Sequence, residues 1–180
     1  MITVLMSVIS LIAVQVSING HTMPLSLCEV LSNRILYNGK MVEVIGRVVA
    51  TDEGEWINQE CNEHPMTGSI PWRTIIWLSY DATGEPALQG DLEINKDVMR
   101  GAILHILNTA KSADELRDSW VVVYGRFETY DKLEAVPSKD GKGISYNGFG
   151  HLNRAPAQIV YRKKDIRYFS HEQIQEILKK

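Results

Sequence analysis

The stretch KMVEVIGRVVAT, residues 40–51, carries the clearest strand signal in this chain of 180 residues. Most of its side chains are apolar and many are β-branched, which favours a buried strand. Gly46 interrupts the run, and a glycine inside a strand often marks a bulge or a sharp coil. The stretch SWVVVYGRFETY, residues 119–130, has the same character around Gly125. Two long strands of this kind are typical of a small β-barrel, whose strands must coil strongly.

Three other segments are predicted as strands from their apolar and β-branched content. They are residues 55–58, 73–80 and 157–167. The second of them reads RTIIWLSY and is the clearest. Two long segments that are rich in turn-forming residues, 59–71 and 132–154, are predicted as loops.

Three helices are predicted from their caps and their periodicity. Ser26 and Glu29 form a capping box, and apolar residues at helical spacing follow as far as the turn at residues 38–39. Residues 96–110 place their apolar side chains on one face. Ser170 caps a last short helix.

The predicted order is a helix, three strands, a helix, two strands and a helix. This order predicts a mainly β (α+β) fold, an OB-fold-like five-stranded Greek-key barrel. One helix precedes strand 1, one lies between strands 3 and 4, and a short one ends the chain. The length fits one domain, which we assign to residues 21–180.

Residues 1–20 are predicted as a signal peptide. The first 28 residues contain no Asp, Glu, Lys or Arg, and residues 2–18 are mostly apolar. This pattern is typical of the apolar core of a secretory signal, with cleavage expected between about Ser17 and Met23. A retained anchor and a segment buried in the fold are the alternatives. We therefore expect a bacterial protein exported to the periplasm or the medium, with no stable membrane span after cleavage.

Three segments of the chain together resemble a group of small, exported, uncharacterised bacterial proteins with an OB-fold domain. The segments are YNGKMVEVIGRV (37–48), YGRFETY (124–130) and YNGFGHLNRAPAQIV (146–160). The resemblance spans most of residues 26–160 and implies the fold and the export. It implies no catalytic residue and no cofactor.

The segment 132–154 is the first candidate binding site, because it is much longer than a connecting hairpin requires. OB-folds commonly bind ligands on the face of strands 2 and 3 and on the loops that join strands 1–2 and 4–5. Aromatic rings stack on sugars or bases, and glycines allow a close approach of the backbone. The alternative is that Phe149 packs on the barrel and His151 caps backbone groups. The candidate ligand-binding residues of this loop are Tyr146, Phe149, His151 and Arg154.

Three tryptophans lie around predicted strands 2 and 3. Trp56 has acidic neighbours and is expected to be partly exposed, whereas Trp77 lies in an apolar strand and is expected in the core. We add Trp56 and Trp72 to the candidate ligand-binding residues, with packing in the core as their alternative.

The two cysteines, Cys28 and Cys61, allow three interpretations. A disulfide between them suits an exported chain. Two free buried thiols are the second interpretation. A metal site is the third, with Glu60, Cys61, Glu63 and His64 as candidate ligands and His151 or Cys28 completing the set. We predict the disulfide and no metal.

The charge of the chain argues against binding of nucleic acid through bulk electrostatics, since the net charge is −3. The charges are unevenly placed. Residues 51–99 hold ten acidic and two basic residues, and residues 154–180 hold seven basic and three acidic ones. The basic stretch is either ordinary solvated surface or a strip for an anionic partner.

No nucleophile elbow, zinc-protease motif or phosphate-binding loop occurs in the sequence, so no catalytic residue and no cofactor is assigned. The leading prediction is an exported OB-fold binding or interaction module for a small molecule, a glycan or a protein of the cell envelope. One alternative is a metal-dependent hydrolase that uses Glu63, His64 and His151. Another is a binder of single-stranded nucleic acid, which the charge and the compartment disfavour.

Overall fold

The computed structural model describes residues 17–18, 21–22, 24–83, 94–109, 119–139 and 141–179. The predicted signal peptide, residues 1–20, lies outside these ranges except for strand β1 (Ser17–Ile18), which pairs with β2 (His21–Thr22). Within the described ranges, none of the helices has the length and apolar content needed to cross a bilayer.

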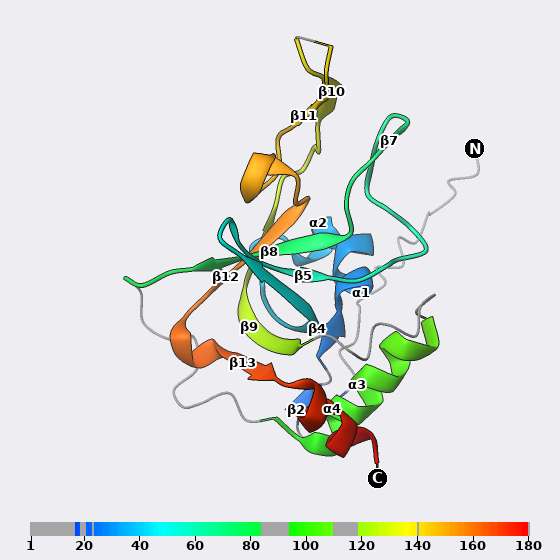
Figure 1. Ribbon diagram of the computed structural model, residues 1–180, viewed down its shortest axis with the longest axis vertical. Helices are drawn as coiled ribbons and strands as arrows, with labels where there is room; N and C mark the ends of the chain where they lie inside the picture. The colour runs from blue at the N-terminus through cyan, green and yellow to red at the C-terminus, as the bar shows by residue number, and fades with distance from the viewer. Residues whose placement is uncertain are drawn as a thin grey trace, which may run out of the picture.

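Five strands form a closed barrel at the centre of the molecule (Figure 1). Neighbouring strands are antiparallel except for one parallel pair, β8 with β12, and β9 pairs back to β4 to close the ring. The protein is therefore mainly β, with a mixed barrel. In ring order the strands are β4 (Met41–Thr51), β5 (Gly54–Asn58), β8 (Ile75–Tyr80), β12 (Ala157–Tyr161) and β9 (Trp120–Thr129).

The prediction of one strand over residues 157–167 is wrong. The structure has two strands there, β12 in the barrel and β13 (Ile166–Phe169) outside it, which pairs with β9. A short 3-10 helix, η3 (Lys163–Asp165), separates them. The chain turns at Lys163 and Lys164, whose exposed side chains do not continue a buried strand, and the Asp165 N–H donates to the Arg162 carbonyl.

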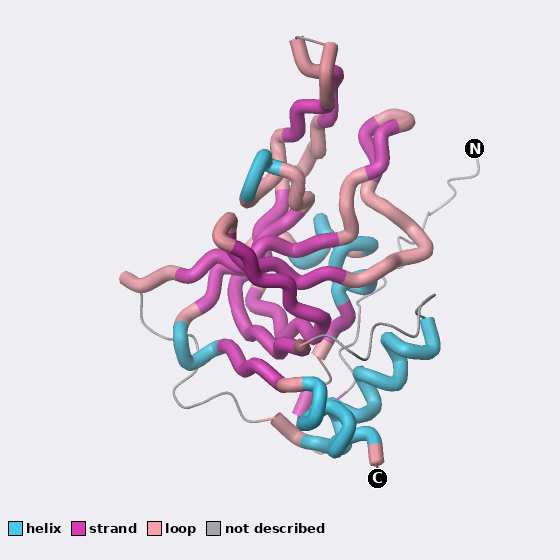
Figure 2. The backbone as a smooth tube through the Cα atoms, viewed as in Figure 1, coloured by secondary structure: helices cyan, strands magenta, loops and turns pink. Residues whose placement is uncertain are grey.

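Four helices and a short strand pack around the barrel (Figure 2). The predicted first helix is two helices, α1 (Leu27–Ser32) and α2 (Arg34–Tyr37), which meet at Asn33. The capping box of Ser26 and Glu29 begins α1 as predicted. The other elements are β3 (Leu25–Ser26), which runs parallel to β4, α3 (Lys96–Thr109) and α4 (His171–Leu178).

Side chains alternate along a strand, so β4 and β9 present side chains on both faces of the sheet. Each of the two faces is covered by a hydrophobic cluster. Val121 and Val123 point into the barrel, where α1 closes one end with Leu27 and Val30. The opposite face of the same strands packs against α3 and α4. The residues of this second core include Ile45, Met99, Ile103, Ile106, Trp120, Val122, Phe169 and Ile174.

The two strand glycines allow close packing inside the barrel. A Cβ on Gly125 would lie 2.5 Å from the Ile159 side chain and 2.6 Å from the Val160 carbonyl oxygen, and one on Gly46 would overlap the Ile57 side chain. These distances are shorter than van der Waals contact. The glycines that interrupt the strand pattern are therefore positions where residues of the neighbouring strand, β12 for Gly125 and β5 for Gly46, approach the backbone.

We expect Gly125→Ala to lower the free energy of unfolding by about 2–3 kcal/mol, because the new methyl group meets backbone that cannot rotate away. Urea denaturation measures the change. The matched control is Gly143→Ala, whose new Cβ would have only the Ser138 hydroxyl nearby, 4.0 Å away. A loss at Gly125 no larger than that at Gly143 would contradict the packing described above.

Candidate ligand-binding face

A row of four side chains crosses the outer face of the barrel from β5 to β9. Trp56 is paired with Trp77, Trp77 with Gln158, and Gln158 with Glu128. Paired residues of neighbouring strands point to the same side of a sheet, so the four side chains share one face. The two indoles stack, with ring centroids 5.9 Å apart and planes 13° apart, and both are half-buried.

The polar end of this row is held by its own hydrogen bonds. Gln158 Nε2 donates to Glu128 Oε2 at 2.7 Å, and Arg126 Nη2 and Nε donate to Glu128 Oε1 at 2.7 and 2.8 Å. The Glu128 side chain is 29% exposed and that of Arg126 is 52% exposed. Donors and acceptors are thus fixed beside the aromatic pair and remain open to solvent.

Two loops meet at Trp77. Gly54, the first residue of β5, and Gly150, before the 3-10 helix η2 (His151–Asn153), both lie so close that a Cβ would overlap the indole. Both glycines have positive φ, 133° and 68°. His151 Nε2 also lies 3.3 Å from Glu53 Oε1, which links the two loops.

The backbone of η2 is strained. Leu152 and Asn153 both have φ of 54°, a left-handed conformation that is costly for Leu152 and that asparagine adopts more readily. The Leu152 side chain does not pack in return, since it is 58% exposed. Such backbone is retained mostly where a binding or catalytic function requires it.

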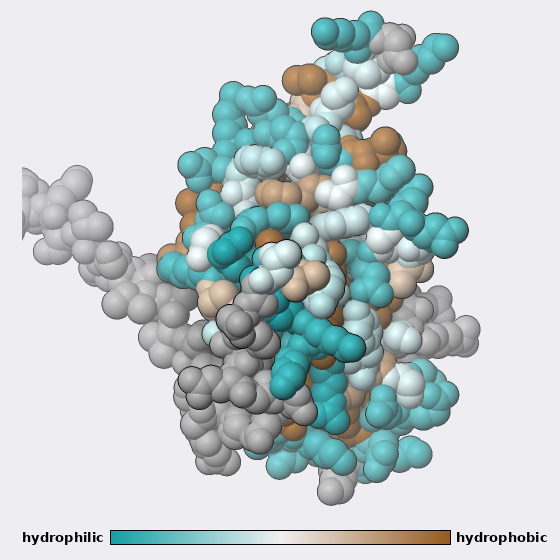
Figure 3. Space-filling view, turned by 90° about the vertical axis from the view of Figure 1, so that its left-hand side faces the viewer, coloured by the Kyte–Doolittle hydropathy of each residue, from teal (hydrophilic) through white to brown (hydrophobic). Residues whose placement is uncertain are grey.

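Figure 3 shows the side of the molecule where the β4–β5 turn and η2 lie in Figure 1. Hydrophobic side chains form small separate patches on this side, among hydrophilic side chains and side chains of intermediate hydropathy. The row from Trp56 to Glu128 fits this mixed character, because it is aromatic at one end and charged at the other. A surface of this kind suits a ligand with both flat apolar and hydroxyl-rich faces.

The structure brings two of the six predicted ligand-binding residues, Trp56 and His151, to this face. Phe149 lies just before Gly150 and is half-buried, and its ring stacks on Tyr130 with centroids 4.9 Å apart. Arg154 is half-buried and ends η2, with its backbone N–H donating to the His151 carbonyl.

The other two predicted residues, Trp72 and Tyr146, lie apart from this face. Trp72 is 1% exposed and therefore packs in the interior, the alternative named above. Its Nε1 donates to Thr67 at 2.9 Å, and Tyr146 meets its ring edge-on at 4.8 Å. Together they join two hairpins within the predicted loops, β6 (Met66–Thr67) with β7 (Ile70–Pro71) and β10 (Ala135–Pro137) with β11 (Ile144–Tyr146).

Sequence reasoning missed four members of the face. Trp77 was expected in the core, which is wrong, because Ile76 and Leu78 on either side point inward and Trp77 therefore points outward. The alternation in IIWLSY was the signal that could have shown this. Arg126, Glu128 and Gln158 carry no local signal, since the pairings of β8 with β12 and of β12 with β9 bring them to the face of Trp77.

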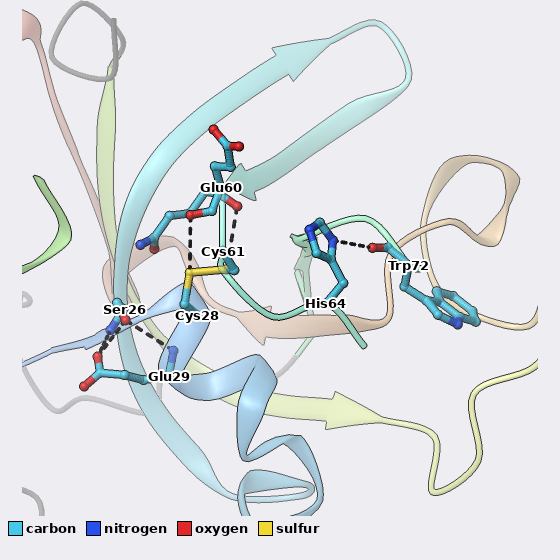
Figure 4. The surroundings of a disulfide bond; sticks show 8 residues. Ser26, Cys28, Glu29, Glu60, Cys61, His64 and Trp72 are labelled. Carbon is cyan, nitrogen blue, oxygen red and sulfur yellow. Dashed lines mark hydrogen bonds between the residues drawn. A yellow bond between two sulfur atoms is a disulfide. The ribbon is translucent and has the colours of Figure 1, made fainter. Parts of the chain in front are cut away.

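A disulfide joins Cys28 in α1 to Cys61 after β5, as predicted (Figure 4). The interpretation of the two cysteines as free thiols is therefore wrong, and neither sulfur remains available as a metal ligand. His64 Nδ1 lies 3.1 Å from the Trp72 carbonyl oxygen. Across the ranges that the structure describes, no three or more His, Cys, Asp or Glu side chains gather as a metal site. The hydrolase with Glu63, His64 and His151 stays a prediction without an assembled site.

No protein-family model matches the chain, and comparison with curated proteins and with solved structures finds no match either.

Proposed function

We propose that this protein is an exported OB-fold module that binds a neutral glycan of the bacterial cell envelope. The OB-fold assignment is supported by the ring order β4-β5-β8-β12-β9 and by the single parallel pair between the third and fifth barrel strands. Export is supported by the uncharged segment before Glu29 and by the disulfide. The resemblance to small exported bacterial proteins agrees with both.

The stacked pair of Trp56 and Trp77 is the observation that most directly supports the proposal of glycan binding. Sugar rings present a face of C–H groups that lies flat on an indole, and their hydroxyl groups then point outward at the ring edge. The amide of Gln158 and the carboxylate of Glu128, next to Trp77 in the same row, offer hydrogen-bond partners for such hydroxyls. Aromatic stacking combined with a few fixed polar groups is the usual construction of a small-molecule site.

A neutral ligand is favoured over a phosphate-rich one by the charges around the face. The carboxylates of Glu53 and Glu128 border it, and the guanidinium of Arg126 is already paired with Glu128. The phosphate backbone of a nucleic acid would therefore meet the two carboxylates and a guanidinium that is already paired. This argues for a glycan and against a single-stranded nucleic acid.

The test is a glycan array followed by calorimetry with the strongest binder. Trp56→Ala is expected to weaken that binding about 10-fold or more, since loss of one stacking ring costs about 1–3 kcal/mol. The control is Tyr80→Ala, which removes another exposed aromatic ring, 55% exposed, from the end of β8. Its expected effect on affinity is less than about two-fold.

Other outcomes of the same experiment identify the alternatives. An array without binders, together with salt-dependent binding of an oligonucleotide that Trp56→Ala weakens, would replace the glycan by a nucleic acid. Turnover of an array glycan into shorter products would make the protein a hydrolase. Equal losses of glycan affinity in Trp56→Ala and Tyr80→Ala would contradict the assignment of the binding site to this face.

A further inference from the structure

Three tyrosines and one carboxylate meet at the end of the barrel that lies away from α1. Strand β5 leads at its far end to Cys61, which is bonded to Cys28 of α1, whereas Glu55 lies at the start of β5. Glu55 is paired with Leu78, whose side chain belongs to the barrel core. Because side chains alternate along a strand, Glu55 points to the inner side of the barrel and Trp56 to the outer side.

The three tyrosines come from three different strands. Tyr80 ends β8 and is paired with Tyr161, which ends β12, and their ring centroids lie 5.8 Å apart with planes inclined by 53°. Strand β13 lies beside the barrel (Figure 1), and from it the Tyr168 hydroxyl donates to Glu55 Oε2 at 2.7 Å. We call these four side chains the tyrosine cluster.

The tyrosine cluster has a buried base and an open rim. Tyr161 packs in the barrel core and is 8% exposed, whereas Tyr80 and Tyr168 are 55% and 45% exposed. Aromatic side chains of this size bury most of their surface in an ordinary core. Two of them thus leave ring surface open to solvent at the mouth of the barrel, next to a third ring that is fixed below.

The charge that hydrogen bonding ties into the cluster is negative. Burial raises the pKa of Tyr168 well above its usual range, and the hydrogen bond to Glu55 raises it further. Burial also raises the pKa of Tyr161. The phenols are therefore neutral over the physiological pH range, and the cluster combines neutral aromatic rings with the carboxylate of Glu55.

The two arginines nearest in the chain have other contacts. Arg162 Nη2 lies 2.9 Å from Asp81 Oδ2. The Arg167 guanidinium carbon lies 5.8 Å from the centroid of the Phe169 ring. Arg167 and Phe169 alternate with Tyr168 along β13, so they point to the opposite face of that strand.

Lys163 and Lys164 of η3 are exposed and lie between the strands that carry Tyr161 and Tyr168. Their field opposes a cation at long range, and salt at physiological concentration screens it over about 8 Å. Glu55 acts at contact distance within the cluster. A cation is therefore held here by short-range contacts with the rings and with Glu55, and long-range attraction does not bring it there.

We propose that the tyrosine cluster binds the quaternary ammonium group of a small compound of the choline type. A cation is attracted to the face of an aromatic ring within about 6 Å, and quaternary ammonium groups are the cations that clusters of aromatic rings recognise. Inclined rings suit a rounded group that touches both Tyr80 and Tyr161, whereas a flat ligand stacks on only one of them. This site is separate from the Trp56–Trp77 face and does not depend on glycan binding.

The experiment compares choline with dimethylbutanol, its neutral isostere in which carbon replaces nitrogen. Choline is expected to bind with a Kd on the order of 1 mM, and the isostere at least about five-fold more weakly. NMR signals of the rings of Tyr80, Tyr161 and Tyr168 should shift during the choline titration. The indole N–H signals of the four tryptophans should stay in place.

Variants at position 168 separate the ring from its hydroxyl. Tyr168→Leu should weaken choline binding about three-fold or more, whereas Tyr168→Phe keeps the ring and should stay within about two-fold of the unchanged protein. The matched control is Tyr130→Leu, which removes an equally exposed ring, 45% exposed, beside α2. Unchanged indole signals of Trp72 and Trp120 verify that each variant is folded.

Vesicles of phosphatidylcholine distinguish the two sources of a choline group. Sedimentation of the protein with these vesicles, reversed by free choline, would assign the lipid headgroup. Choline binding without such sedimentation would assign the free compound.

Four results would overturn the proposal: no binding of choline, equal binding of the neutral isostere, tyrosine signals that do not shift, or the same affinity in Tyr168→Leu as in Tyr130→Leu. The Trp56→Ala variant should bind choline as the unchanged protein does, and Tyr80→Ala should weaken choline binding while glycan affinity stays within about two-fold. A failure of this inference is therefore distinguishable from a failure of the proposed glycan face.

Discussion

Replacing Cys28 by serine and Cys61 by alanine in one variant is expected to lower the free energy of unfolding by about 3–4 kcal/mol. The disulfide closes a loop with a sequence separation of 33 residues, so its loss frees the unfolded chain of a long-range constraint. Alanine is chosen at position 61 because that side chain is 4% exposed and a buried hydroxyl would add its own cost. Urea denaturation of the two proteins measures the difference.

Reduction of the unchanged protein serves as the control for this variant. Dithiothreitol should lower its stability by a similar amount and should leave the double variant unaffected. A loss below about 1 kcal/mol in both experiments would mean that the bond contributes little to the fold.

Glu43→Gln is expected to raise the free energy of unfolding by up to about 3 kcal/mol at pH 8 and to change it little near pH 4. Burial in the wall of β4, opposite Tyr124, raises the pKa of Glu43 to about 7. Between the unfolded pKa of about 4.3 and pH 7, the folded protein keeps a proton that the unfolded chain has lost. Stability therefore falls as the pH rises through this window, and glutamine removes the fall.

The measurement is the urea midpoint of each protein from pH 4 to pH 8. The control is Glu176→Gln on the exposed side of α4, which should leave the shape of the pH profile unchanged. A profile of Glu43→Gln that runs parallel to that of the unchanged protein would show that Glu43 titrates normally.

The sequence predicts the elements whose signals are local. The runs around Gly46 and Gly125 form long strands, and the capping boxes at Ser26 and Ser170 begin helices. The disulfide was predicted from compartment and cysteine number, which do not depend on the fold. Each of these signals lies within a few residues or in the composition, where it can be read without the partner strands.

The sequence does not predict the elements that depend on distant contacts. The hairpins β6–β7 and β10–β11 have strands of only two or three residues, too short for a periodic signal. They form because Trp72 and the segment at Leu133 pack together, which no local pattern shows. The same reason explains the Trp56–Trp77 face, because Trp77 meets Gly150 and Gln158 only after the barrel closes.

The four tryptophans allow the most direct test of the proposed glycan-binding face. Two of them, Trp56 and Trp77, are half-buried on the face, and two, Trp72 and Trp120, are 1% and 0% exposed in the interior. Each indole N–H gives one NMR signal, which single Trp→Phe variants assign. Titration with the strongest glycan from the array should shift the signals of Trp56 and Trp77 and leave those of Trp72 and Trp120 in place. Binding that leaves the signals of Trp56 and Trp77 unshifted would contradict the account.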